Sequence, residues 1–146
     1  MDKSQLKKFF ETNSVPANVI KYVFNDNEIP PENVTKFEWS NFFTKLVNAN
    51  IDFKDEFVSK LLYLSYLNNG TSFYFTEIKK FFKNEEEDYS HVLDILVKFS
   101  NKYISIINEF ILKLSFKNQR LFYIIKYLYK KDKNLLFDVI KSNIAD

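Results

Sequence analysis

Apolar residues recur along most of the chain at intervals of three and four, which is the spacing of one face of an α-helix. The clearest stripe is formed by four large side chains, Trp39, Phe42, Phe43 and Leu46. Thr35 and Glu38 precede this stripe at the separation that an N-terminal capping box requires. Six or seven segments of this kind predict a mainly α fold, a compact bundle of six to seven helices.

Breaks in the pattern predict where helices end and how the chain is organised. The stripe after Asp52 stops at Asn69-Gly70, because glycine takes the positive φ of a helix end without strain. The strongest break, residues 26–31, contains two prolines, and we interpret it as a loop because neither flank is long enough to fold alone. We therefore expect a single domain over 1–146, with N-terminal helices in 1–50 and a helical core in 51–146.

Residues 103–117 fit two kinds of secondary structure. Ile104, Ile107 and Ile111 have helical spacing, whereas the alternation of apolar and polar residues from Phe110 to Phe116 is typical of a strand. The high content of Ile, Phe and Tyr favours the strand slightly. Both interpretations remain open from the sequence, because the period of a short apolar run does not distinguish them.

The arrangement of apolar positions over residues 55–128 resembles a winged helix-turn-helix domain. Its three helices correspond to Phe57–Asn68, Thr76–Phe82 and Tyr89–Leu96. The resemblance implies that one short β-hairpin near 103–117 is the wing, and that Gln119 begins a flanking or dimerisation helix. It also implies DNA reading by the third helix.

An acidic run argues against that DNA-reading role. Glu85, Glu86, Glu87 and Asp88 stand immediately before the third helix of the resemblance, which offers few basic or amide side chains. Duplex affinity depends largely on cations that contact phosphates, so four consecutive acids oppose it. We therefore expect a winged-helix-like shape without DNA reading.

Composition excludes several chemistries. The chain has no Cys, one His (His91) and one Gly (Gly70). These counts exclude Cys-ligated zinc, iron–sulfur clusters, thiol catalysis, multi-histidine metal sites and glycine-rich phosphate loops. No catalytic, cofactor-binding or metal-binding residue is predicted, and we expect no enzyme.

The chain's wider composition bears on its location and source. We find no membrane span or signal peptide and expect a cytoplasmic protein of the source cell or of a host. The ratio of 20 Lys to 1 Arg is typical of an AT-rich genome, such as that of a low-GC bacterium, its phages or plasmids, or a large DNA virus.

The acidic run is the first candidate binding site. We predict that it contacts a partner together with nearby aromatic residues; the set is Glu85, Glu86, Glu87, Asp88, Tyr89 and Tyr74. Such acids can steer association with a basic surface, for example that of a nucleic-acid-binding protein. The structural alternative is that they complement the positive N-terminus of a helix.

The C-terminal third has the opposite charge and is the second candidate. Residues 113–141 carry eight basic and two acidic residues. The predicted nucleic-acid-binding set is Lys113, Lys117, Arg120, Lys126, Lys130 and Lys131. Interleaved aromatic residues such as Phe122 and Tyr129 could stack on bases. The structural alternative is a helix with an apolar core face and a lysine face toward water.

These two candidates define two functions. We favour a non-enzymatic protein-binding module of the inhibitor, immunity, anti-defence or adaptor type, acting by shape and charge complementarity. The alternative is a winged-helix DNA- or RNA-binding regulator, or a replication accessory protein of a phage, a plasmid or an AT-rich genome. A homodimer is compatible with either function.

Overall fold

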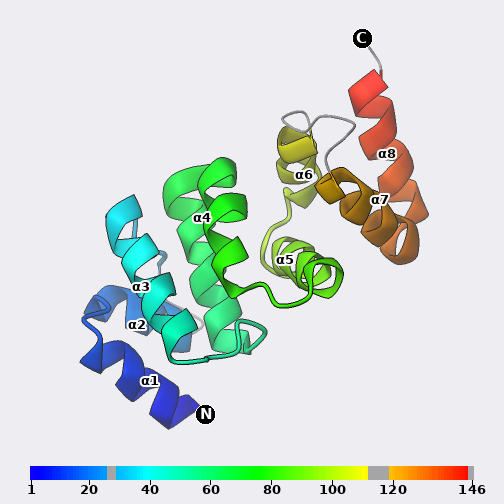
Figure 1. Cartoon of the computed structure of the whole chain (residues 1–146). Helices are drawn as coiled ribbons and strands as arrows, with labels where there is room; N and C mark the ends of the chain where they lie inside the picture. Colours follow the sequence, from blue (N-terminus) through cyan, green and yellow to red (C-terminus); the bar gives the residue numbers. More distant parts are fainter. Residues whose placement is uncertain (26–28, 112–118, 145–146) are drawn as a thin grey trace. The chain divides into compact units, whose positions relative to one another are not determined.

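The computed structural model describes residues 1–25, 29–111 and 119–144. Within these ranges the chain forms eight α-helices and one short 3-10 helix, and no strand. The predicted mainly α fold is therefore confirmed. The chain divides into two compact units, Met1–Phe82 and Lys83–Asp146, which are described separately below (Figure 1). The single domain expected from the sequence stays a prediction.

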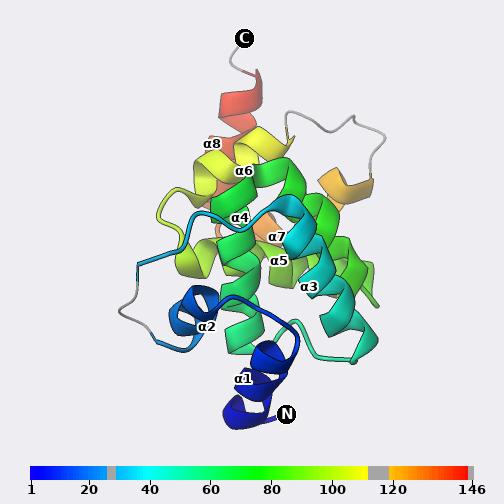
Figure 2. The same cartoon turned by 90° about the vertical axis from the view of Figure 1, so that its left-hand side faces the viewer.

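The first unit is built around one long helix. Its elements are α1 (Lys3–Thr12), α2 (Ala17–Phe24), α3 (Lys36–Asn48), α4 (Glu56–Glu77) and the 3-10 helix η1 (Ile78–Phe81). Figure 2 shows α2 and α3 on either side of α4, and both helices contact it. The unit therefore has its core around α4.

Side chains that the sequence places before helices cap them. The Thr35 hydroxyl accepts a hydrogen bond from the Glu38 amide at 3.2 Å, and the Glu38 carboxylate accepts one from the Thr35 amide. The predicted capping box at α3 is thus confirmed. The Asp55 carboxylate accepts hydrogen bonds from the amides of Phe57 and Val58 and so caps α4. Each such cap stabilises its helix by about 1 kcal/mol.

Gly70 interrupts α4, as the sequence predicts. Its φ of 86° and ψ of −176° lie outside the helical region and divide α4 into two helical parts. Just before the break, the Asn68 side chain donates to the Pro31 carbonyl at 2.9 Å and accepts from the Val34 amide at 3.2 Å. These bonds attach Pro31 and Val34, at and just after the end of the predicted break, to α4 of the first unit.

Aromatic rings fill the core of the first unit. Trp39 and Phe43 are fully buried, and their ring centroids are 5.9 Å apart. Phe43 contacts Phe81 at 5.6 Å, and Phe81 stacks on Phe53 at 5.5 Å. Such pairs contribute about 0.5–1.5 kcal/mol each beyond the burial of their area. The stripes at 39–46 and from 53 onward are therefore core residues, as predicted.

The second unit contains four helices. They are α5 (Glu85–Phe99), α6 (Tyr103–Ile111), α7 (Gln119–Lys131) and α8 (Lys133–Ile144). α7 contacts both α5 and α8, and α8 also contacts α6. α7 therefore packs against two other helices of this unit.

The β-hairpin expected near 103–117 is contradicted over the part of this segment that the structure describes. Residues 103–111 form α6, and residues 112–118 lie outside the described part. Ile106 and Ile107 are buried whereas Ile104 is exposed, which is one-sided burial with a helical period. This segment also lacks the glycine that a tight hairpin turn favours. The winged-helix resemblance itself stays a prediction.

Candidate functional site

The acidic run forms the first turn of α5. Asn84 is the N-cap, and its side-chain oxygen accepts a hydrogen bond from the Glu87 amide at 3.3 Å. The Asp88 carboxylate is only 3% exposed and accepts hydrogen bonds from the amides of Lys83 (2.7 Å) and Asn84 (3.0 Å). Negative charge is favourable at this end of a helix. Asp88 therefore supports the start of α5, while Glu85 and Glu87 remain exposed.

The two tyrosines of the predicted partner site lie in protein interior. Tyr89 is 0% exposed, and its ring stacks on that of Tyr123 with centroids 5.8 Å apart. Tyr74 is 1% exposed and belongs to the first unit, whereas Glu85–Tyr89 belong to the second. Burial raises the pKa of both phenols, so both stay neutral at ordinary pH. Neither ring offers surface to a partner.

Acids of α5 face lysines of α7. Glu86 forms an ion pair with Lys126. The hydrogen bond from Lys126 lowers the pKa of the Glu86 carboxyl, and the charge of Lys130 lowers it further. The acidic and basic candidates of the sequence thus meet within one unit, and part of their charge is neutralised there.

A second contact between these helices centres on Asp94. Its carboxylate accepts a hydrogen bond from the Tyr127 hydroxyl at 2.6 Å and lies 3.6 Å from the Lys131 ammonium. Burial raises the pKa of Tyr127, and the hydrogen bond to Asp94 raises it further. The neutral phenol therefore remains a donor to Asp94.

The predicted nucleic-acid-binding residues divide into two groups. Lys113 and Lys117 lie outside the described residues, and of Arg120 the structure describes only its place as the second residue of α7. The other three, Lys126, Lys130 and Lys131, lie on α7. Lys130 and Lys131 are exposed and Lys126 is half-buried.

The same helix has an exposed apolar stripe, of which the sequence indicated the two aromatic residues but not the stripe itself. Phe122 is 60% exposed, Ile125 41% and Tyr129 58%. Their separations of three and four residues place them on one face of α7, and a different set, Ile124, Tyr127 and Leu128, is buried. α7 is therefore apolar on two sides. The spacing of 122, 125 and 129 is the signal that identifies this second stripe.

Apolar exposure continues on α8. Phe137 and Ile140 are exposed and lie three residues apart on that helix. Lys133, the first residue of α8, lies with its ammonium 4.9 Å from the centre of the Tyr129 ring. Both helices thus combine exposed apolar side chains with lysines.

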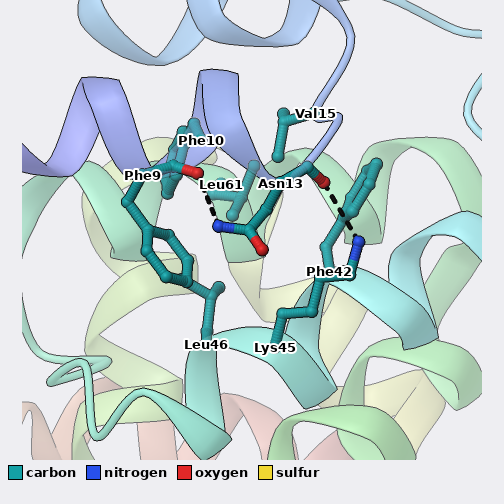
Figure 3. Close-up of a pocket in the computed structure, with 8 residues that line it drawn as sticks. All are labelled: Phe9, Phe10, Asn13, Val15, Phe42, Lys45, Leu46 and Leu61. Carbon is teal, nitrogen blue, oxygen red and sulfur yellow. Dashed lines mark hydrogen bonds between the residues drawn. The ribbon is translucent and has the colours of Figure 1, made fainter.

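Two hollows lie in the first unit. Lys45 donates to the Asn13 carbonyl at 3.2 Å over a small apolar pocket of about 10 Å³, shown in Figure 3. That volume accommodates about one water molecule. A larger open depression of about 200 Å³ includes Asp52 and Asp55, but both carboxylates accept backbone amide hydrogen bonds.

The described residues hold no cluster of three or more His, Cys, Asp or Glu side chains that could bind a metal ion. In the same part of the chain, no helix has both the length and the apolar character that crossing a bilayer requires. Comparisons with protein families, curated proteins and solved structures found no match to this chain.

Proposed function

We propose that this chain is a non-enzymatic protein-binding module of the inhibitor, immunity or adaptor type, acting in the cytoplasm of the source cell or of a host. Its binding surface is the α7 stripe, defined as Phe122, Ile125 and Tyr129. The observation that supports this proposal is the exposure of all three side chains on one face of α7, whose opposite face is already buried.

The stripe fits a known mode of recognition. Helices that dock in apolar grooves use anchors at positions i, i+3 and i+7, which is the spacing of Phe122, Ile125 and Tyr129. Complete burial of a large apolar side chain contributes about 1.5–3 kcal/mol relative to exposure. Three such anchors supply the core of an interface, and aromatic residues are common among its strongest contacts.

The positive charges beside the stripe indicate that the partner's groove is acidic. Lys130 lies next to the stripe in the helical period, and Lys133 lies over the Tyr129 ring. A groove rimmed by carboxylates would complement them and would associate faster at low salt. This partner differs from the basic one that the acidic run predicts, because Asp88 is buried and Glu86 is paired with Lys126.

The test compares surface variants that leave the fold intact. The variant Phe122→Ser, Ile125→Ser, Tyr129→Ser changes only exposed positions of the second unit. A matched control, Ile29→Ser with Phe37→Ser, changes two strongly exposed apolar residues of the first unit. Each protein is used for quantitative affinity capture from an extract of the source organism, and captured proteins are then purified for calorimetry.

The expected result is at least one protein that binds the wild type and the control equally and loses affinity by about tenfold or more with the triple variant. A set of captured proteins that all bind the triple variant as tightly as the wild type would refute the proposal. Circular dichroism of every variant verifies that its helices are intact.

One observation favours nucleic acid as a second candidate. Phe122 and Tyr129 alternate along α7 with Lys126 and Lys130, an arrangement in which rings stack on bases and ammonium groups contact phosphates. Replacement of Lys126, Lys130 and Lys131 by Glu would then abolish a salt-dependent shift of labelled single-stranded DNA. A wild-type chain that shows no such shift at low salt would exclude this candidate.

A further inference from the structure

The lysines of α7 are held by acids of the same unit. Lys126 pairs with Glu86, and Lys131 lies 3.6 Å from the Asp94 carboxylate. Both pairs are partly exposed, so they lie where an anionic partner would approach. Two of the three described lysines in the predicted nucleic-acid-binding set therefore already have a carboxylate partner.

We propose that Glu86 and Asp94 are specificity determinants that neutralise the α7 lysines and so keep nucleic acid off this surface. The inference rests on the proposed function, because it states which class of macromolecule the same surface excludes. The partner is then a protein, because a protein groove can bury the apolar stripe. A polynucleotide is excluded, because its phosphates need cations that are not already paired with carboxylates.

The physical basis is counterion release. A lysine that contacts a phosphate releases a counterion from the nucleic acid, and this release supplies much of the affinity. A lysine with its own carboxylate has little net charge to offer, and displacing that carboxylate leaves an anion beside the phosphate. Burial of Phe122, Ile125 and Tyr129 in a protein groove requires no such displacement.

The two acids occupy defined positions on α5. Tyr127 donates to Asp94 at 2.6 Å, and Tyr127 is itself buried, so its hydroxyl fixes one carboxylate oxygen near Lys131. Glu86 stands in the first turn of α5, which Asn84 caps. The helix thus places Glu86 opposite α7, and the hydrogen bond from Tyr127 holds the Asp94 carboxylate there.

The test uses fluorescence anisotropy with labelled oligothymidylate of about 20 nucleotides, titrated at several salt concentrations from about 50 mM upward. The variant Glu86→Gln with Asp94→Asn removes both negative charges, and Asn retains an oxygen that accepts from Tyr127. The matched control is Glu85→Gln with Glu87→Gln, which makes the same charge change on α5 at exposed positions for which the described structure gives no ion pair.

We expect the Glu86/Asp94 variant to bind the oligonucleotide about tenfold more tightly than the wild type at low salt. Its logarithmic salt slope should be steeper by about 1.4, because two freed lysines each contribute about 0.7 for a single strand. The control should differ from the wild type by no more than about twofold.

Three results would overturn the inference. The first is equal affinity and slope for the wild type and the Glu86/Asp94 variant. The second is an equal gain in the control, which would make net charge the cause. The third is tight, steeply salt-dependent binding by the wild type itself. None of these depends on the stripe variants, so failure here and failure of the proposed function are distinguishable.

Discussion

The two units use the same kinds of residue in opposite ways. In the first unit, rings such as Trp39, Phe43 and Phe81 contact one another in the core around α4. In the second, Phe122, Tyr129 and Phe137 face solvent on α7 and α8. An abundance of aromatic residues therefore does not by itself indicate a large core. What distinguishes the two uses is whether a second element covers the apolar face.

The difference originates in how many apolar faces each helix has. α3 has one apolar stripe, and α4 and η1 cover it. α7 has two, and its contacts with α5 and α8 leave Phe122, Ile125 and Tyr129 exposed. The comparison predicts that equivalent substitutions have large effects on stability in the first unit and large effects on binding in the second.

The largest expected effect is the replacement of a buried ring. Phe43→Ala should lower the free energy of unfolding by about 3–5 kcal/mol, because it leaves a cavity in a packed core. Phe122→Ala, at an exposed position, should change it by less than about 0.5 kcal/mol. Urea unfolding followed by circular dichroism reports on the helices of both units, and the fluorescence of Trp39, the chain's single tryptophan, adds a separate signal for the first unit. Similar losses in both variants would contradict the comparison.

The buried acid of the second unit should have the next largest effect. Asp88→Ala removes the acceptor for the amides of Lys83 and Asn84 and should destabilise α5 by about 1–2 kcal/mol. Glu87→Ala, one residue earlier and exposed, should cost less than half as much. Hydrogen exchange of the α5 amides measures both values. Equal loss of protection would show that Asp88 acts only through its charge.

Loss of one cap in the first unit should have a smaller effect. Thr35→Ala removes the hydroxyl that accepts from the Glu38 amide and should cost about 1 kcal/mol. Thr44→Ala, inside the same helix, should be close to neutral because Ala has the higher helix propensity. Urea denaturation again gives both values. A neutral Thr35 variant would mean that water replaces the capping box.

The smallest effect concerns the ion pair between the helices. Because Lys126 lowers the pKa of Glu86, the charged carboxylate is favoured in the folded state. The stabilisation is therefore present at neutral pH and is lost as the pH falls through the lowered pKa. An NMR titration of the Glu86 side-chain carbon should give a midpoint below the ordinary value of 4.5, and Lys126→Met should raise it. An unchanged midpoint would show that the pair does not persist in solution.

Local signals were enough to predict the parts of the structure that depend on neighbours in sequence. The capping box at Thr35 and the helix break at Gly70 each involve residues within a few positions, and both are confirmed. Single apolar stripes such as 39–46 likewise predicted the core, because one helical face needs only one partner surface.

Contacts between distant segments explain what the sequence did not predict. Asp94 and Tyr127 are 33 residues apart, so no local pattern indicates their hydrogen bond. The burial of Tyr89 depends on Tyr123 in the same way. For residues 103–111, the content of β-branched and aromatic residues favoured a strand, but burial on one helical face prevailed.

The backbone conformation of Gly70 predicts which amino-acid configuration this position accepts. Apart from its neighbours in the chain and the nearby backbone of the same helix, no atom lies within 4 Å of the position that a β-carbon would occupy there, so the site has room for a side chain. Its φ of 86° with ψ of −176° is nevertheless unfavourable for residues of the L configuration. The mirror-image dihedral angles belong to ordinary extended backbone. A D-alanine introduced at this one position by chemical synthesis should therefore be accepted where L-alanine is not, which separates a requirement for stereochemistry from a requirement for space.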